Sequence, residues 1–217
     1  MAEAVDYKQI GSRPVRPDGV DKVTGRARFG ADLVLPNMIY GKVLRSPHAH
    51  ARIKSVDVSG ALAIDGVMAA ISGSDFPGGT SGGEVVGEGG GTVDDVAKNV
   101  MARDKVLYHG HAVAAVAAKT SAIAESALAA IKVEYEVLEP VLDVVAAMAE
   151  DAILVDENQY TNLPEKPEKP SNIANVGHLE RGNVGEGFEQ ADVVIEREYK
   201  VPMAHQGYIE PHACVAS

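Results

Sequence analysis

The chain has 217 residues, a formal net charge of -11 and 46% hydrophobic residues, which is enough apolar material for one large domain or two small ones. The acidic balance argues against nucleic-acid binding, because contacts to phosphates need clustered Lys and Arg. The one cysteine, Cys214, excludes an intrachain disulfide and a metal site made only of cysteines. An acidic N-terminus and the lack of about 18 consecutive apolar residues predict a cytoplasmic protein with no spanning helix.

Residues 1–24 are predicted to form an extended N-terminal arm. Glycine and proline recur through this stretch and on to Pro36, and its apolar residues follow no clear period. Arg13, Arg16 and Lys22 make the arm locally basic within an acidic chain. A solvated arm and a docking strip for a partner are the two interpretations of this local charge.

Residues 38–72 predict a series of strands. A turn that contains proline, residues 46–50, separates the first two strands, and Ser59 offers a cap for a short helix before the third. We expect these strands to join those of residues 105–139 in one mixed sheet with helices packed on it. The predicted strands are residues 38–45, 51–58 and 67–71.

Residues 78–92 form a glycine-rich stretch with eight glycines in fifteen positions. A phosphate-binding loop is one interpretation, but no Gly-Lys-Ser/Thr follows and no G-x-G-x-x-G opens a helix. Glu88 also places a carboxylate where a pyrophosphate would be repelled. A surface loop is therefore the prediction.

Residues 105–139 are predicted to be the core unit, with the order strand, helix, strand. Residues 112–118 are an uninterrupted apolar run, typical of a strand covered on both faces. Thr120 or Ser121 then offers an N-cap, and residues 132–137 alternate polar and apolar as a half-buried strand does. The helix has an apolar stripe at helical spacing, made of Ile123, Ala127, Leu128 and Ile131.

The second half of the chain is a connector followed by an unfinished pattern. Residues 142–148 predict a short apolar helix, and residues 158–172 are a linker rich in Pro, Glu and Lys. Residues 185–190 predict a short helix or turn, and residues 191–201 and 204–216 predict two strands. Two strands are too few for an independent domain.

Two His-x-His pairs, His48 with His50 and His109 with His111, are candidate metal ligands. Residues i and i+2 of a strand share a face, so one pair could supply two ligands. A metal site needs a further ligand, and nothing in the sequence identifies it. We therefore favour a structural interpretation of both pairs.

His205, Glu210, His212 and Cys214 crowd the end of the chain. Three of them alternate along one predicted strand, so a thiolate or soft-metal role is conceivable. A half-buried strand with a small apolar cysteine is the favoured interpretation. No G-x-S-x-G, H-E-x-x-H or C-x-x-C motif is present. The sequence by itself identifies no catalytic, cofactor-binding or metal-binding residue.

Three stretches in order resemble the molybdenum hydroxylase family of xanthine dehydrogenases, aldehyde oxidases, CO dehydrogenases and 4-hydroxybenzoyl-CoA reductase. The first is similar to the opening of that family's molybdopterin-binding large subunit: IGSRPVRPDGVDKVTGRARFGADLVLPNMIYGKVLRSPHAHARIKSVD. The second is similar to the strand, helix and strand that follow: DKVLYHGHAVAAVAAKTSAIAESALAAIKVEYEVLEPVLDVVAA. The third is similar to the beginning of the molybdenum-binding domain: FEQADVVIEREYKVPMAHQGYIEPHACVA.

The resemblance implies an α+β fold with an α/β hammerhead domain. It divides the chain into an arm (1–24), the hammerhead domain (25–139, with the loop 78–92), a connector (140–180) and the start of a molybdopterin-binding domain (181–217). It also implies a molybdenum-cofactor oxidoreductase that hydroxylates or oxidises an aldehyde, an N-heterocycle or a related small substrate. Iron-sulfur (2Fe-2S) clusters and FAD on other subunits would carry the electrons.

The family's cofactor-contacting motifs lie beyond the Glu210-Pro-His212 segment, and this chain stops at Ser217. No catalytic residue is therefore carried over, and Glu210 and His212 match positions that we interpret as structural. Iron-sulfur ligation needs several cysteines, and this chain has one.

The leading hypothesis is a non-catalytic part of a large subunit, a split subunit or a fragment, that needs the cofactor-bearing portion as its partner. The alternative is a stand-alone structural or binding module without enzyme activity. A third hypothesis is an independent enzyme that uses the histidine pairs and a metal.

Overall fold

The computed structural model describes residues 8–76, 85–86, 91–165, 167–210 and 212–216. The chain divides into two compact units, each described here by itself. The larger unit is Met38–Val194, and the other consists of Met1–Asn37 and Ile195–Ser217. None of the described helices is long and apolar enough to cross a membrane.

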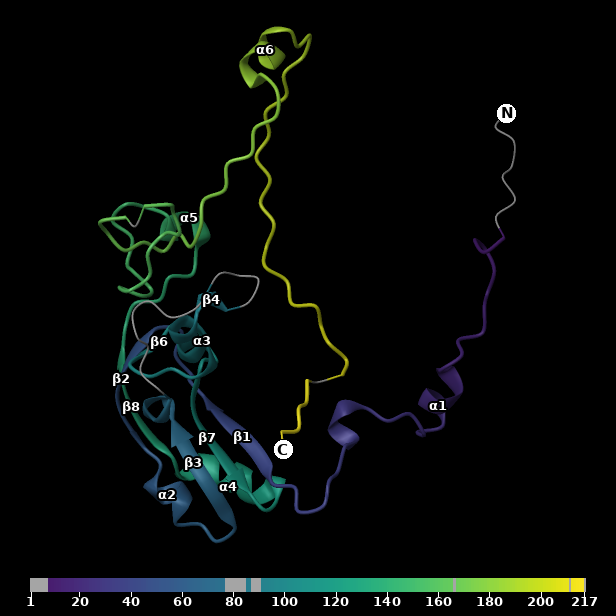
Figure 1. Ribbon diagram of the computed structural model, residues 1–217, viewed down its shortest axis with the longest axis vertical. Helices are drawn as coiled ribbons and strands as arrows, with labels where there is room; N and C mark the ends of the chain where they lie inside the picture. The colour runs from purple at the N-terminus through teal and green to yellow at the C-terminus, as the bar shows by residue number, and fades with distance from the viewer. Residues whose placement is uncertain (1–7, 77–84, 87–90, 166, 211, 217) are drawn as a thin grey trace. The chain divides into compact units, whose positions relative to one another are not determined.

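The larger unit contains an antiparallel sheet with β7 (Ala112–Ala118) at its centre (Figure 1). The strands β1 (Tyr40–Arg45) and β3 (Val67–Ser72) pair with its two edges. Register places Val43 and Ile71 opposite the same residue, Ala115. The predicted strands of this region are confirmed to within about two residues.

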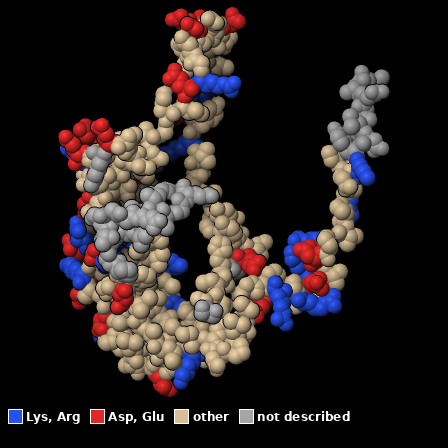
Figure 2. All heavy atoms as spheres, viewed as in Figure 1, with Lys and Arg blue, Asp and Glu red and all other residues tan. Residues whose placement is uncertain are grey.

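A second antiparallel sheet has β2 (Ala51–Asp57) between β6 (Lys105–Val106) and β8 (Lys132–Val137). Acidic and basic side chains lie next to one another on the side of the unit that carries β2 and β8 (Figure 2), as in the ion pair of Lys54 with Glu136. Because these strands form two separate antiparallel sheets, the expectation of one mixed sheet is wrong. Residue periodicity reports which faces of a strand are buried, but it does not determine the partner with which the strand pairs.

Helix α4 (Ser121–Ala130) covers one face of the first sheet and connects β7 to β8 of the other sheet (Figure 1). The Thr120 hydroxyl accepts a hydrogen bond from the Ile123 backbone N–H at 3.2 Å, which confirms the predicted N-cap. Ala124 and Ala127 are fully buried, so the helix backbone lies close to the sheet. The predicted order of strand, helix and strand is confirmed, but the two strands belong to different sheets.

The core has two parts, one on each face of β7. Ala114, Val116 and Ala118 pack with the buried residues of α4, whereas Val113 packs with Val106 and its neighbours on the other face. The prediction that this strand is covered on both faces is confirmed.

Several short elements complete the larger unit, and the sequence did not reveal the helix α3. Helix α2 is confirmed near its predicted position, although Ser59 is its first residue, and Asp57, not Ser59, accepts the hydrogen bond there. The glycine-rich stretch lies largely outside the described residues. The elements are α2 (Ser59–Leu62), η2 (Gly73–Asp75), β4 (Val85–Val86), β5 (Gly91–Thr92), α3 (Val93–Val100), α5 (Val144–Ala147) and α6 (Val184–Glu189).

The other unit contains two short helices, α1 (Gly19–Val23), which lies in the arm predicted to be extended, and η1 (Gly30–Asp32). The two strands predicted at 191–201 and 204–216 are not formed. The described residues after Gln190 lie in neither helix nor strand. A strand is stable only when a neighbouring strand satisfies its backbone groups. The alternating pattern is present in this segment, but no partner strand accompanies it among the described residues.

Gly73 offers a test of the packing between η2 and the loop before β6. A Cβ at this buried position would overlap the Ala102 carbonyl oxygen and lie 2.7 Å from Arg103 Cα. We expect Gly73→Ala to lower the free energy of unfolding by about 1–3 kcal/mol, because backbone atoms cannot move aside cheaply. The urea midpoint of the chain measures this change.

Gly41→Ala in β1 is the matched control, because a Cβ there meets nothing within 4 Å. Its urea midpoint should stay at the wild-type value. Equal midpoints for the two variants would contradict the close approach at Gly73.

Candidate functional site

His111 is fully buried, and both of its ring nitrogens bind backbone groups. Nδ1 accepts from the Leu107 N–H at 3.3 Å, and Nε2 lies 2.8 Å from the Lys98 carbonyl oxygen. Because a carbonyl only accepts, Nε2 carries the hydrogen and the ring is neutral. Burial lowers the pKa of His111 below its usual value of 6.5.

The bond from His111 satisfies a carbonyl in the last turn of α3, where helix carbonyls lack partners within the helix. Tyr108 stacks on the imidazole with ring centroids 4.3 Å apart and donates its hydroxyl to the Asn99 carbonyl at 3.2 Å. His109 is exposed, so this pair does not share a face. His111 is therefore a structural group that holds the 107–111 turn against α3.

The other pair is also divided between two environments. His50 is 4% exposed, and its Nδ1 lies 2.7 Å from the Glu139 carbonyl oxygen, so Nδ1 is the donor. Its Nε2 is buried and has no hydrogen-bond partner among the described residues. His48 is half-buried and packs edge-on against Tyr135 at 4.9 Å. The two imidazoles therefore have different surroundings, and His50 joins the start of β2 to the chain just after β8.

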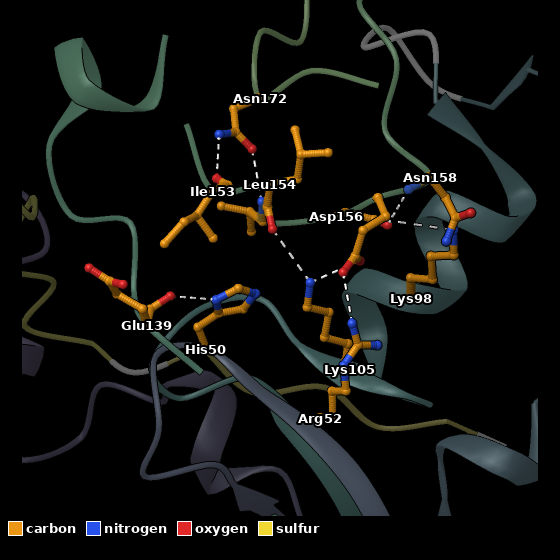
Figure 3. A network of polar contacts seen from close by, with 12 residues as sticks. His50, Arg52, Lys98, Lys105, Glu139, Ile153, Leu154, Asp156, Asn158 and Asn172 are labelled. Carbon is orange, nitrogen blue, oxygen red and sulfur yellow. Dashed lines mark hydrogen bonds and ion pairs between the residues drawn. The ribbon is translucent and has the colours of Figure 1, made fainter. Parts of the chain in front are cut away.

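Three charged side chains that are far apart in sequence meet on the second sheet (Figure 3). Glu157 lies 2.9 Å from Arg52 Nη2 of β2 through one oxygen and 2.9 Å from Lys105 Nζ of β6 through the other. The hydrogen bond with Lys105 is the largest cause that lowers the pKa of Glu157, and the charge of Arg52 adds to it. The Lys105 side chain is only 10% exposed, whereas Glu157 is 46% exposed, so this carboxylate pairs with the ammonium of a largely buried side chain.

Asn172 forms the second part of the same network (Figure 3). Its Nδ2 donates to the Ala147 carbonyl at 3.1 Å and to the Ile153 carbonyl at 2.9 Å, while its Oδ1 accepts from the Val155 N–H at 2.9 Å. One amide thus fixes three backbone groups of the connector. Sequence reasoning missed both Glu157 and Asn172, because their partners lie between 17 and 105 residues away and no local pattern marks them.

A pocket of about 480 Å³ lies beside this network in the larger unit. The end of α3 and the residues of the connector form its walls. Its polar groups include Asp156, 4.0 Å from Lys98, and Asn172, which is engaged by the backbone as described above. Its lining residues are Lys98, Asn99, Leu107, Val141, Leu142, Asp143, Val144, Ala147, Val155, Asp156, Gln159 and Asn172.

The terminal cluster lies in the other unit. Tyr208 contacts His205 and His212, with ring centroids 5.4 and 5.0 Å away. Glu210 accepts a hydrogen bond from the Gly30 N–H at 3.1 Å, and Cys214 is exposed. The prediction that Glu210, His212 and Cys214 share one strand face is wrong, because the described residues form no strand there.

Among the described residues, no three His, Cys, Asp or Glu side chains form a group that could hold a metal ion. Most polar side chains of the larger unit described above bind backbone groups or opposite charges, whereas His50 Nε2 has no partner among the described residues. We therefore derive no chemical step from this chain's own residues.

Comparison with known proteins gives two family matches. Residues 24–139 match the family described as "Aldehyde oxidase and xanthine dehydrogenase, a/b hammerhead domain", and residues 165–217 match "Molybdopterin cofactor-binding domain". Residues 140–164 lie between the two matches.

Similar proteins are longer than this chain. The "Nicotinate dehydrogenase large molybdopterin subunit" of Eubacterium barkeri is 37% identical over 97% of this chain and 45% of its own length. The "Carbon monoxide dehydrogenase large chain" of Afipia carboxidovorans is 31% identical over 96% of this chain and 25% of its own length. A crystal structure of quinoline 2-oxidoreductase from Pseudomonas putida, 35% identical, superposes with a TM-score of 0.52 over 69% of this chain and 19% of that one. The chain thus spans less than half the length of these relatives.

The structural role of His111 predicts how stability depends on pH. Its folded pKa lies below 6.5, so as pH falls the unfolded chain takes up the proton first. Stability is therefore complete above about pH 6.5 and is lost as pH decreases toward the folded pKa. We expect His111→Gln to lower the free energy of unfolding by about 1–3 kcal/mol at neutral pH and to weaken this pH dependence.

His109→Gln, the same substitution at an exposed neighbour, is the control and should keep the wild-type profile. Urea midpoints measured between about pH 5 and 8 give the comparison. An unchanged pH dependence in His111→Gln would show that this imidazole is not the responsible group.

Proposed function

We propose that this chain, which belongs to the aldehyde oxidase and xanthine dehydrogenase family, forms the hammerhead-bearing part of a molybdenum-cofactor oxidoreductase. The order of the two family matches supports this assignment, since a cofactor-binding segment follows the hammerhead. The reaction of the complete enzyme is the hydroxylation or oxidation of an aldehyde, an N-heterocycle or a related small substrate. Names of the relatives, such as nicotinate dehydrogenase, support this substrate class.

The domain organisation that we propose follows the sequence. An arm (1–24) precedes the hammerhead domain (25–139), a connector (140–180) follows it, and residues 181–217 begin the molybdopterin-binding domain. In this organisation the hammerhead is a scaffold that packs against the cofactor-bearing portion. It contributes no catalytic residue of its own.

The observation that carries the proposal is the exposure of the apolar side chains after Gln190. Ile195 and Val201 are 74% and 86% exposed, and Ile209 is fully exposed. Exposed apolar residues in an alternating pattern are typical of a strand that lacks its sheet. A partner that supplies neighbouring strands would cover these side chains and satisfy the backbone beside them.

The partner in this proposal is the downstream portion of the large subunit, which holds the molybdopterin-bound molybdenum. Iron-sulfur (2Fe-2S) and FAD subunits receive the electrons, since one cysteine cannot bind such a cluster. Neither nucleic acid nor a membrane is a partner, and the assembled enzyme is cytoplasmic.

A stand-alone structural module is the second candidate. The core of the hammerhead supports it, because β7 is buried on both faces within this chain. Hydrogen exchange separates the two candidates. A stand-alone module needs residues 191–217 to be protected in the isolated chain, whereas a scaffold for a partner leaves them open until the partner binds.

Co-expression with the polypeptide that continues the large subunit tests the leading proposal. We expect the two to purify together with molybdenum, and we expect residues 191–210 to become at least about tenfold slower in hydrogen exchange in the complex. Ile209→Asp should reduce co-purification, because a carboxylate cannot be buried in an apolar contact at low cost.

Ile209→Val is the conservative control and should still form the complex. Neither variant should change the urea midpoint of the chain alone, since Ile209 is fully exposed there. Stoichiometric cofactor and substrate oxidation by the isolated chain would overturn the proposal.

A further inference from the structure

The connector of the larger unit is attached to the hammerhead strands at one end and to the cofactor-binding segment at the other. Residues 140–164 lie outside both family matches, yet they contain the contacts that join the matched regions. Glu157 contacts the strands β2 and β6, and Asn172 belongs to the segment matched by the cofactor-binding domain. We propose that Glu157 and Asn172 are positioning residues that fix where the cofactor-binding segment leaves the hammerhead.

The first set of contacts joins the connector to the strands β2 and β6. It is the ion bridge of Arg52, Lys105 and Glu157, here called the Glu157 clasp. Both carboxylate oxygens are used, one for each cation, at 2.9 Å. Lys105 also donates to the Leu154 carbonyl at 3.5 Å, so the same ammonium holds the backbone three residues earlier. Because the Lys105 side chain is only 10% exposed, we expect the loss of its counter-charge to cost more than the loss of a fully exposed ion pair.

The second set of contacts lies within the connector and joins residues 147–162 to residues 171–174, which the cofactor-binding family match already includes. Asn172 binds the backbone of Ala147, Ile153 and Val155 through three hydrogen bonds between 2.9 and 3.1 Å. The backbone adds the Ser171 N–H bound to the Gln159 carbonyl and the Asn162 N–H bound to the Ala174 carbonyl, both at 2.9 Å. These bonds set the connector and the start of the next segment side by side.

Together the two sets of contacts link strand, connector and segment without a continuous secondary structure. The link restricts the path of the chain, because one carboxylate pairs with two cations and one amide pairs with three backbone groups. The inference rests on the proposed function, since the segment positioned in this way leads into the proposed cofactor-binding domain.

Hydrogen exchange of the whole chain tests the clasp directly. Glu157→Gln keeps the size of the side chain but removes its charge. We expect the amides of Val155 and Ser171 to exchange roughly tenfold faster in this variant, while the amides of β7 keep their rates. Glu136→Gln is the matched control, because the Lys54–Glu136 pair lies on the same sheet with both side chains at least half exposed.

Two further variants keep the test decisive. Asn172→Asp retains an acceptor for Val155 but loses both donors, so the same amides should exchange faster while the Glu157 clasp is intact. Glu157→Asp keeps the negative charge beside Arg52 and Lys105 and should therefore retain part of the protection lost in Glu157→Gln. The proposal would be overturned if the amides of Val155 and Ser171 exchanged at wild-type rates in Glu157→Gln. It would also be overturned if their exchange rates rose only as much as those of the β7 amides.

The complex with the continuing polypeptide gives a readout that a merely structural role would not move. Glu157→Gln should weaken binding of that polypeptide about tenfold, and Glu136→Gln should not. Unchanged binding in Glu157→Gln would contradict the positioning role. If the wild-type chain binds no such polypeptide, the proposed function fails, whereas the exchange rates still decide whether Glu157 holds the connector.

Discussion

The burial of β7 on both faces is the constraint on which the rest of the larger unit depends. Its one face packs against α4 and its other face against Val106 and the second sheet. The strand is made of alanine and valine, so its neighbours approach closely and each buried methyl group contributes a similar, modest free energy. In the proposed function the hammerhead is a scaffold, and many small apolar contacts suit a part that holds others in place.

Several polar groups inside the larger unit make structural contacts. His111 binds the end of α3, His50 binds the Glu139 carbonyl, and Glu157 neutralises Lys105. A group that already has its partners gains little from a metal or a substrate, because new bonds would replace existing ones. The network of Figure 3 therefore agrees with the proposed scaffold role of the hammerhead.

The segment after Gln190 has the opposite character. Its apolar residues are exposed and its described backbone lacks strand partners, although its sequence alternates as a strand does. In the proposed function a neighbour completes this segment, and the family match of residues 165–217 indicates the kind of neighbour. The connector lies between the buried hammerhead core and this exposed segment. Its contacts with Arg52 and Lys105, and those that Asn172 makes within it, define its path.

The sequence by itself determined the local elements of the hammerhead: the strand at 112–118, the Thr120 cap, the helix after it and the strand at 132–137, since each depends on contacts within a few residues. It also indicated the family through three ordered stretches. Only the tertiary structure decided that the strands form two antiparallel sheets, that the histidine pairs are divided, and that Glu157 meets Arg52 across 105 residues. Periodicity encodes which side of an element is buried, whereas pairing and long-range charge contacts depend on how the whole chain packs.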